Sequence, residues 1–301
     1  MSCTVVAYGE ILWDLLPSGA VLGGAPFNFA YRVNSLGHRG VMASRLGLDT
    51  SYLQRDAEHP TGTVEVSFDE QRNPRYRIIP DVAYDFIEPV ENLHHLVAGA
   101  ECLCYGTLVQ RRAISRSTLY QLLDGFTGRF ALLDINLRPD CYTRASILES
   151  IRRANILKLN DSEAELLAEI YGVQQGEGVA DPGAFTDALF ARSDLQFVVL
   201  TLGEKGVFVA SRDGQKVYHP AFSVQLRDPV GAGDGFTAGF LDSLLKERSL
   251  AEACRFASAL GALVASQEGA TQPLDRSRIE KFLRSAERGP VEEDLRAYLI
   301  S

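Results

Sequence analysis

Two kinds of hydrophobic pattern alternate along most of this chain. Short apolar runs predict buried strands, and longer segments with an apolar residue every three or four positions predict helices. The strand pattern occurs at residues 4–8, 40–46, 101–105, 129–135, 156–159, 197–202 and 207–211. The helical pattern occurs at residues 26–36, 115–126, 144–154, 162–171, 182–191, 233–247, 250–267 and 276–284. This alternation predicts an α/β fold with a central, mostly parallel sheet and helices on both faces.

Residues 61–80 follow a different pattern. Polar and apolar side chains alternate from Thr63 to Phe68, which predicts a strand with one solvated face. Residues 69–74 are turn-like, and residues 75–79 predict a second strand. This hairpin does not fit the alternating layer, so we expect a small β lid with strands drawn from about 15–24 and 61–80. Lids of this kind exclude water from a reacting site. We expect a single domain over residues 1–301.

The segment 228–241, with the sequence DPVGAGDGFTAGFL, is the most informative stretch of the chain. Gly231, Ala232 and Gly233 stand where a helix is predicted to begin, so their N–H groups lack intrahelical acceptors. Those donors and the positive end of the helix dipole can hold an anion. Asp234 would repel a bound phosphate unless it takes a proton from a hydroxyl that attacks that phosphate. The motif therefore indicates phosphoryl transfer to an alcohol, and the alternative is a capped turn without chemistry.

A second small-residue turn leads into the first predicted helix. Gly23 and Gly24 would let a ligand approach the backbone closely, and Asn28 can both donate and accept hydrogen bonds, which suits a sugar hydroxyl. Asp14 follows the first strand, where a carboxylate can bind vicinal hydroxyls. The alternatives are a tight strand-to-helix connection for the glycines and a helix cap or turn for Asp14.

Composition and charge narrow the range of partners. The net charge of −9 and the pI near 5.2 argue against nucleic acid or an anionic membrane as the main partner. The five cysteines are odd in number and fit no zinc pattern, so reduced thiols in a cytoplasm are expected. The sequence shows neither a signal-peptide pattern nor 18 consecutive apolar residues. The chain lacks the Gly-x4-Gly-Lys motif of Walker-type kinases, which excludes that class. In a Rossmann dehydrogenase Asp234 would lie against the pyrophosphate of the cofactor, which argues against that class as well.

The motifs together amount to a family resemblance. The turn 23–30, with Gly37 and Gly47 at matching distances, resembles the first signature of the ribokinase or PfkB family of carbohydrate kinases. Segment 228–241 resembles the second signature, and Asn160-Asp-Ser-Glu163 resembles the family's Asn-x-x-Glu element. Residues 134–139 and 200–206 are similar to two further family segments. The resemblance covers nearly the whole chain in the correct order, and residues 9–14 and 23–28 look most like bacterial fructokinases.

The resemblance implies a role for each motif residue. Asp234 would be the catalytic base, and the γ-phosphate would be held by the anion hole of Gly231, Ala232 and Gly233. Sugar hydroxyls would be bound by Asp14, Gly24, Asn28 and Arg138. The nucleotide or its phosphates would be contacted by Lys158, Thr201 and Gly203. Mg²⁺ would be organised through water by Asn160 and Glu163. The alternatives are a surface salt bridge for Arg138 and a capping box at a helix start for Asn160 and Glu163.

The implied protein is an ATP-dependent, fructokinase-like sugar kinase with a ribokinase-like three-layer sandwich and a small β lid. It would act on a sugar with ATP and Mg²⁺, as a homodimer formed through the lid. Some family members also use a monovalent cation near the anion hole. A 2-keto-3-deoxygluconate kinase, a pentose kinase and a non-catalytic sugar-binding member of the same fold stay open. Arg75 or Arg77, if directed into the pocket, would favour an acidic sugar.

Two departures from the family pattern affect these expectations. Pro229 stands where the family often has Thr, which removes a hydroxyl and a backbone N–H. After Gly47 about one helix is missing by comparison with the family, which would uncover apolar sheet surface. Because every expected site residue is retained, we expect the fold to survive; aggregation or non-cooperative unfolding of the purified chain would contradict this.

Overall fold

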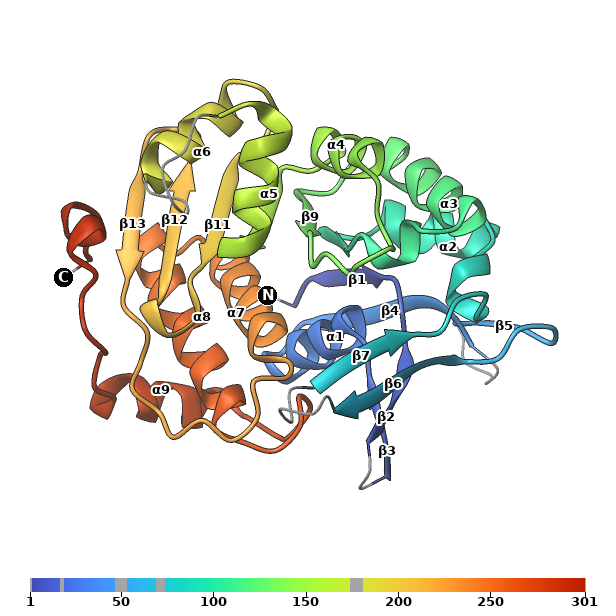
Figure 1. Cartoon of the computed structure of the whole chain (residues 1–301), viewed down its shortest axis with the longest axis horizontal. Coiled ribbons are helices and arrows are strands. Elements are labelled where there is room, and N and C mark those ends of the chain that lie inside the picture. Colours follow the sequence, from blue (N-terminus) through green and yellow to red (C-terminus); the bar gives the residue numbers. More distant parts are fainter. Residues whose placement is uncertain (1, 17–18, 47–52, 69–73, 174–180, 301) are drawn as a thin grey trace.

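The computed structural model describes residues 2–16, 19–46, 53–68, 74–173 and 181–300. Its main element is a nine-stranded sheet with the order β13-β12-β11-β10-β9-β8-β1-β4-β5 (Figure 1). Its strands are β1 (Thr4–Tyr8), β4 (Arg39–Leu46), β5 (Leu53–Arg55), β8 (Cys102–Tyr105), β9 (Phe130–Asp134), β10 (Ile156–Asn160), β11 (Phe197–Thr201), β12 (Val207–Ser211) and β13 (Lys216–His219). All neighbours pair in parallel from β5 to β11, and β12 and β13 add antiparallel pairs. The predicted α/β class with a mostly parallel sheet is confirmed.

Two helical layers cover this sheet. One apolar core lies under α2 (Glu91–Ala98), α3 (Ala113–Asp124), α4 (Arg144–Arg153), α5 (Asp161–Tyr171) and α6 (Pro182–Phe190). The core on the other face lies under α1 (Ala25–Ser35), α7 (Ala232–Leu245), α8 (Leu250–Ala265) and α9 (Arg276–Ser285). Strand β1 joins the two cores, because Val6 and Tyr8 enter the first and Val5 and Ala7 enter the second. The fold is therefore a three-layer sandwich of the ribokinase type.

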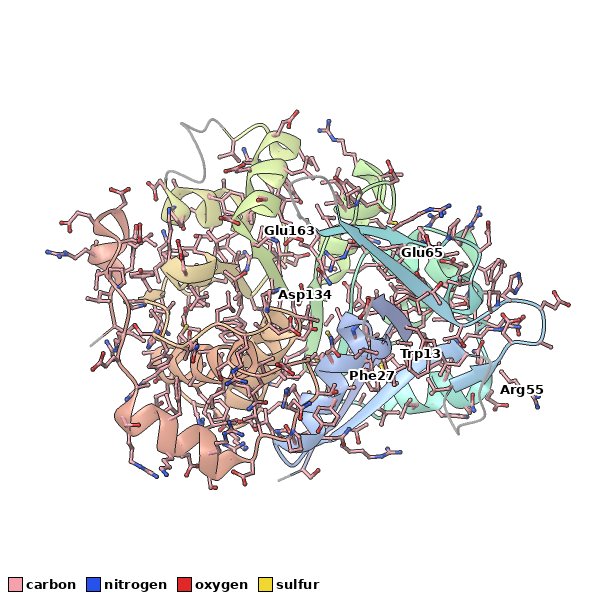
Figure 2. The ribbon with its side chains drawn as sticks, turned by 60° about the horizontal axis from the view of Figure 1, so that its bottom comes forward. Trp13, Phe27, Arg55, Glu65, Asp134 and Glu163 are labelled. Atoms are coloured by element: carbon pink, nitrogen blue, oxygen red, sulfur yellow. The ribbon has the colours of Figure 1, made fainter. Side chains whose placement is uncertain are left out.

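A separate four-stranded sheet forms the lid, in the order β3-β2-β6-β7. Its strands are β2 (Leu12–Leu16), β3 (Gly19–Gly23), β6 (Gly62–Phe68) and β7 (Pro74–Ile78). Val64 is 6% exposed and its neighbour Glu65 lies in solvent, so the predicted hairpin with one wet face is confirmed there. The side chains of residues 66–68 and the turn 69–73 lie outside the described part. Figure 2 shows Glu65 on the lid and Asp134 toward the middle of the molecule.

Several short elements had no clear signal in the sequence. Helix α2 has eight residues with two adjacent histidines, and β5 and β13 have three and four residues. Segments of this length are too short to show a helical or strand period. Among the described residues no helix is long and apolar enough to cross a membrane. All five cysteines are free thiols.

The shortened connection after Gly47 leaves two parallel strands unusually close in sequence. Strand β5 pairs only with the last three residues of β4, and residues 47–52 between them lie outside the described part. Parallel neighbours usually need a dozen or more connecting residues. A groove beside β5 is lined mostly by polar side chains, and not by the apolar surface that we expected. The polar residues are Arg45, Gln54, Arg55, Glu88, Glu91 and Asn92.

Arg45 is the centre of this polar edge. Its Nε lies 2.9 Å from Asp56 Oδ2, and its Nη1 donates to the carbonyl oxygen of Phe86 at 2.7 Å. Asp56 also accepts from the backbone of Glu58 and His59 at 2.8 Å each. These contacts join β4 to the residues after β5 and stabilise this edge of the sheet, where the resemblance implies a further helix.

Candidate active site

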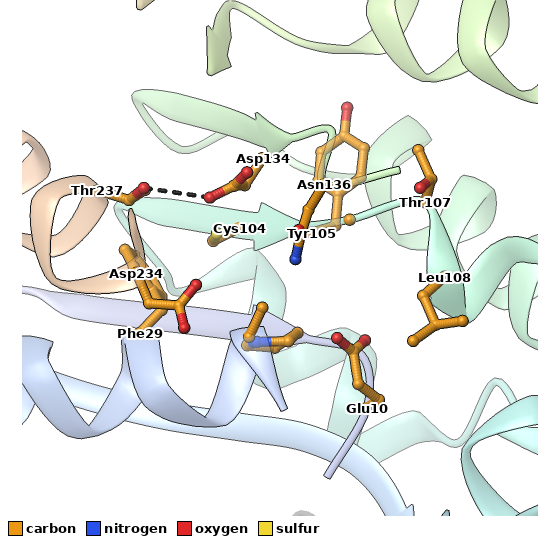
Figure 3. A pocket seen from close by; sticks show the side chains of 13 residues that line it. Glu10, Phe29, Cys104, Tyr105, Thr107, Leu108, Asp134, Asn136, Asp234 and Thr237 are labelled. Atoms are coloured by element: carbon orange, nitrogen blue, oxygen red, sulfur yellow. Dashed lines mark hydrogen bonds between the residues drawn. The ribbon is translucent and has the colours of Figure 1, made fainter. Parts of the chain in front are cut away.

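The candidate site lies beyond the carboxyl ends of parallel strands, where sheets of this kind bind ligands. Strands β1, β8 and β9 end there, and the helices α1 and α7 begin there. A pocket that is open to solvent is formed by residues from these elements and the loops after them (Figure 3). Its polar side chains are Glu10, Tyr105, Thr107, Asp134, Asn136, Asp234 and Thr237. The sequence placed only Asp234 of this set among its candidates.

The N-terminus of α7 has the geometry expected of an anion site. Gly231 is the N-cap at φ 78°, and a Cβ there would lie 2.3 Å from the Cβ of Ala270, so only glycine fits. Helix α7 starts at Ala232, whose N–H donates to the carbonyl oxygen of Pro229 at 3.2 Å. One of the three expected donors is therefore engaged within the turn. Gly233 follows in the first turn, where the N–H groups have no acceptor four residues earlier.

Asp234 and Asn28 meet although 206 residues separate them in the sequence. Asn28 Nδ2 donates to Asp234 Oδ2 at 2.9 Å, and Asn28 Oδ1 is buried without a partner among the described residues. Burial raises the pKa of Asp234 to about 6, and the charge of Asp134 adds to the rise. The Asn28 hydrogen bond and the charges of Lys158 and Arg138 oppose it. A carboxylate with a pKa near neutrality is suited to accept a proton from a hydroxyl.

Lys158 and Asp134 form an ion pair beside this helix start. Lys158 Nζ lies 3.1 Å from Asp134 Oδ1, and Thr237 Oγ1 donates to Asp134 Oδ2 at 3.2 Å (Figure 3). A Cβ on Gly233 would lie 3.2 Å from Lys158 Nζ, which places the ammonium group at the first turn of α7. Burial acts to lower the pKa of Lys158, but the charges of Asp134, Glu163 and Asp234 outweigh burial and raise it. Lys158 therefore stays charged next to the anion hole.

Asn160 and Glu163 adopt the capping-box arrangement at the start of α5. Asn160 Oδ1 accepts from the Glu163 N–H, and Glu163 Oε2 accepts from the Asn160 N–H, both at 2.8 Å. Glu163 Oε1 accepts from the Leu137 N–H at 2.7 Å, so both carboxylate oxygens already hold backbone groups. Among the described residues no group of three or more His, Cys, Asp or Glu side chains could hold a metal. The pair fits a Mg²⁺ ion only through water, as the resemblance implies.

None of the expected sugar-binding residues, Asp14, Gly24, Asn28 and Arg138, lines this pocket, although Gly24 directly precedes Ala25, which does. Gly24 has φ 111°, and a Cβ there would lie 2.6 Å from the carbonyl oxygen of Glu10. Asp14 is carried by the lid strand β2, and a Cβ on Gly23 would lie 2.3 Å from its Oδ2. Burial raises the pKa of Asp14, and the charge of Arg138 lowers it.

Arg138 follows β9 and is exposed, with Nη1 donating to the carbonyl oxygen of Leu137 at 3.3 Å. Its charge lowers the pKa of three carboxyl groups of the site, those of Glu10, Asp14 and Asp234. It forms no ion pair within the described ranges. The surface salt bridge is therefore not seen in the described part, and the substrate-facing role stays a prediction.

Thr201 and Gly203 lie outside the pocket, on the side of β10 and β11. Thr201 Oγ1 donates to the carbonyl oxygen of Leu159 at 3.2 Å, and Gly203 has φ 59° at the start of a short 3₁₀ turn. A Cβ on Gly203 would contact nothing within 4 Å, so the space beyond it is open. Thr201 and Gly203 therefore lie apart from Asp234 along one edge of the sheet, and Lys158 lies between them and Asp234.

Glu10 was missed by the sequence analysis. It is 5% exposed, lines the pocket and has one carboxylate oxygen, Oε2, without a partner in the described structure. Burial raises its pKa to about 7. The available signal was a carboxylate directly after the first strand, in Gly9-Glu10, at the strand end where ligands gather.

Comparison with known proteins identifies the class. A family model described as pfkB family carbohydrate kinase matches residues 42–276, which is well over half of the chain. The chain therefore belongs to the pfkB family of carbohydrate kinases, and the predicted family is confirmed.

Individual relatives differ in their named sugar. Fructokinase of Escherichia coli is 26% identical over 91% of this chain and 97% of its own length. A double mutant of Vibrio cholerae O395 fructokinase, solved with fructose, ADP and a potassium ion, has a TM-score of 0.77 at 24% identity, covering 93% of this chain and 98% of that one. A 2-dehydro-3-deoxygluconokinase of Thermotoga maritima has a TM-score of 0.79 at 18% identity, covering 94% of this chain and 100% of that one. At these identities the two solved structures show the shared fold alone.

Proposed function

We propose that this member of the family is a fructokinase-like enzyme that transfers the γ-phosphate of ATP to a sugar hydroxyl, with Asp234 as the base. The observation that carries the proposal is the position of Asp234. Its carboxylate is held by Asn28 at the wall of the pocket, has a pKa of about 6, and stands in the first turn of a helix whose N-terminus can receive an anion.

Each residue of the site has a separate role in the proposed phosphoryl transfer. Asp234 takes the proton of the acceptor hydroxyl as the hydroxyl oxygen forms its bond to the γ-phosphorus. The bond from that phosphorus to the bridging oxygen breaks, and ADP leaves with the electron pair. The amide groups at the start of α7 and the Lys158 ammonium are placed to stabilise the charge on the transferred group. Mg²⁺, organised through water by Asn160 and Glu163, would neutralise charge on the ATP phosphates.

The charges around the pocket favour an uncharged acceptor. Glu10, Asp14 and Asp234 contribute carboxyl groups, and Arg138 is the cation that acts on all three. Arg77 is 75% exposed and pairs with Glu65 across the lid at 3.1 Å, so it gives no support to an acidic sugar. The side chain of Arg75 lies outside the described part. These features support fructose over 2-keto-3-deoxygluconate, and they leave pentoses as a second candidate.

ADP release from Mg-ATP, measured with fructose, glucose, ribose and 2-keto-3-deoxygluconate, tests this proposal. We expect fructose to give the largest stimulation, because fructokinases are among the similar proteins. We expect 2-keto-3-deoxygluconate to give the smallest, because it alone of the four carries a carboxylate. Repeating the assay with and without K⁺ tests whether a monovalent cation is needed. A protein that binds fructose but releases no ADP with any of the sugars would contradict the kinase and support the non-catalytic sugar-binding alternative.

We also propose a homodimer formed through the lid. Leu15 and Val21 on the lid strands are 41% and 45% exposed, which leaves apolar side chains for a partner to cover. Sedimentation equilibrium should give about twice the 33.0 kDa chain mass. Exchange of Leu15 for Glu should shift the mass toward the monomer. A monomeric wild-type protein at micromolar concentration would refute the dimer.

A further inference from the structure

Glu10 is held in the pocket wall by the backbone of the first helix. The backbone N–H groups of Glu10 itself and of Ala25, at the start of α1, act to lower the pKa of its carboxyl group. A Cβ on Gly24 would lie 3.4 Å from Glu10 Cγ, so the side chain packs closely under this turn. These backbone groups still leave one carboxylate oxygen, Oε2, buried without a partner in the described structure.

That second oxygen, Oε2, is the unexplained feature. It is buried without a hydrogen-bond partner among the described residues, although an unpaired polar group in a protein interior carries a desolvation cost. Figure 3 shows the carboxyl groups of Glu10 and Asp234 facing the same space, with Asn136 opposite. A ligand in this pocket would therefore lie beside the carboxyl groups of Glu10 and of the proposed base.

The charged and titratable groups around Glu10 come from three other elements. Arg138, in the loop after β9, and Asp234, in α7, act on it with opposite signs. Tyr84 lies behind it in the 3₁₀ segment Ala83–Phe86, where the charge of Glu10 acts to raise the tyrosine pKa. The Tyr84 hydroxyl is also buried without a partner in the described part. A water bridging Tyr84 and Glu10 is therefore the structural alternative to a ligand contact.

We propose that Glu10 binds a hydroxyl of the sugar acceptor through Oε2 and selects uncharged acceptors over sugar acids. This inference rests on the sugar-kinase function proposed above. A sugar hydroxyl can both donate and accept, so it pairs with either protonation state of the carboxyl group. A carboxylate on the acceptor can accept a hydrogen bond only from the protonated form, and the ionised form repels it.

The pH dependence follows from these two states. With its pKa raised to about 7 by burial, Glu10 is largely protonated at pH 6 and largely ionised at pH 8. The KM for fructose should therefore change little over this range. The KM for 2-keto-3-deoxygluconate, or its inhibition constant if it is not turned over, should rise by about tenfold between these pH values.

Glu10→Gln is the decisive variant, because it keeps the size and hydrogen-bonding capacity of the side chain and removes the charge. We expect fructose affinity, measured without ATP, to stay within about threefold of wild type. The preference for fructose over 2-keto-3-deoxygluconate at pH 8 should fall by about tenfold, and its dependence on pH should shrink to the part that ionisation of Asp234 contributes. Glu10→Ala should weaken fructose binding by roughly tenfold, because the contact is lost.

Tyr84→Phe provides the matched control for the bridging water. It removes the neighbouring unpaired hydroxyl and leaves the carboxyl group in place, so sugar preference should not change. If Glu10→Gln keeps the wild-type preference and pH dependence, or if Tyr84→Phe reproduces its effects, the inference is wrong. Failure of the proposed function is tested by a different variant. Near-normal turnover by Asp234→Asn would overturn the proposed mechanism, whatever result the Glu10 variants give.

Discussion

Replacement of Asp234 by Asn is expected to lower kcat by about two to four orders of magnitude. The amide has nearly the shape of the carboxyl group and can still meet Asn28, but it cannot take the proton of the acceptor hydroxyl. ATP binding, measured by titration of the folded variant, should stay close to wild type, because the proposed role begins only when the hydroxyl reacts. Turnover near the wild-type rate would remove Asp234 as the base.

The same group sets the acid side of the pH profile. Burial and the charge of Asp134 raise the pKa of Asp234 to about 6, so the carboxyl group is mostly ionised at pH 7. As the pH falls through 6 the base becomes protonated, and kcat/KM for fructose should fall about tenfold per pH unit. A profile that stays flat down to pH 5 would contradict this assignment.

Replacement of Asp242 by Ala is expected to destabilise the protein by about 3–5 kcal/mol. Asp242 is completely buried in α7, and its Oδ1 meets His38 Nε2 at 3.0 Å, Lys246 Nζ at 2.5 Å and Arg276 Nη2 at 2.7 Å. These partners come from the turn after α1, from the end of α7 and from α9. Removing the carboxylate would leave the other groups without their acceptor, and the helix that carries Asp234 would lose its anchorage.

Urea unfolding measures this loss, and Asp187→Ala is its control. Asp187 pairs with Lys216 at 2.7 Å, but its side chain is 63% exposed, so its loss should cost less than about 1 kcal/mol. Burial acts to raise the pKa of Asp242, but its three hydrogen bonds outweigh burial and lower it. Its contribution is therefore present above its unfolded-state pKa and is lost as the pH falls through the lower, folded value. Equal losses for the two variants would show that burial of Asp242 contributes nothing.

Most of the fold could be predicted from the sequence, because the hydrophobic patterns of helices and strands are local. Long segments with a clear period, such as 250–267 and 144–154, were predicted as helices and form α8 and α4 with small differences at the ends. The elements without a signal, α2, β5 and β13, are short and depend on tertiary packing. The polar groove beside β5 was also unforeseen, because the side chains that fill it come from both sides of the shortened connection.

Only part of the candidate site could be predicted from the sequence. The order of small residues before Asp234 predicted a helix start that could bind an anion, since the unpaired amides of a helix start depend on neighbouring residues alone. The protein used Asn160 and Glu163 in a capping box, an alternative that the sequence had left open. Asp134 and Thr237 acquired their places only through contacts with distant parts of the chain.

The sequence by itself determined the α/β class, the family and the position of the proposed base, because helix periods, strand runs and turn motifs depend on residues close together in the chain. The tertiary structure alone decided the chemistry of the pocket. It brought Asn28 to Asp234, set Lys158 beside Gly233, and buried one oxygen of Glu10 without a partner. Burial and the nearest charges fix the pKa of a carboxyl group, and both depend on residues far apart in the sequence.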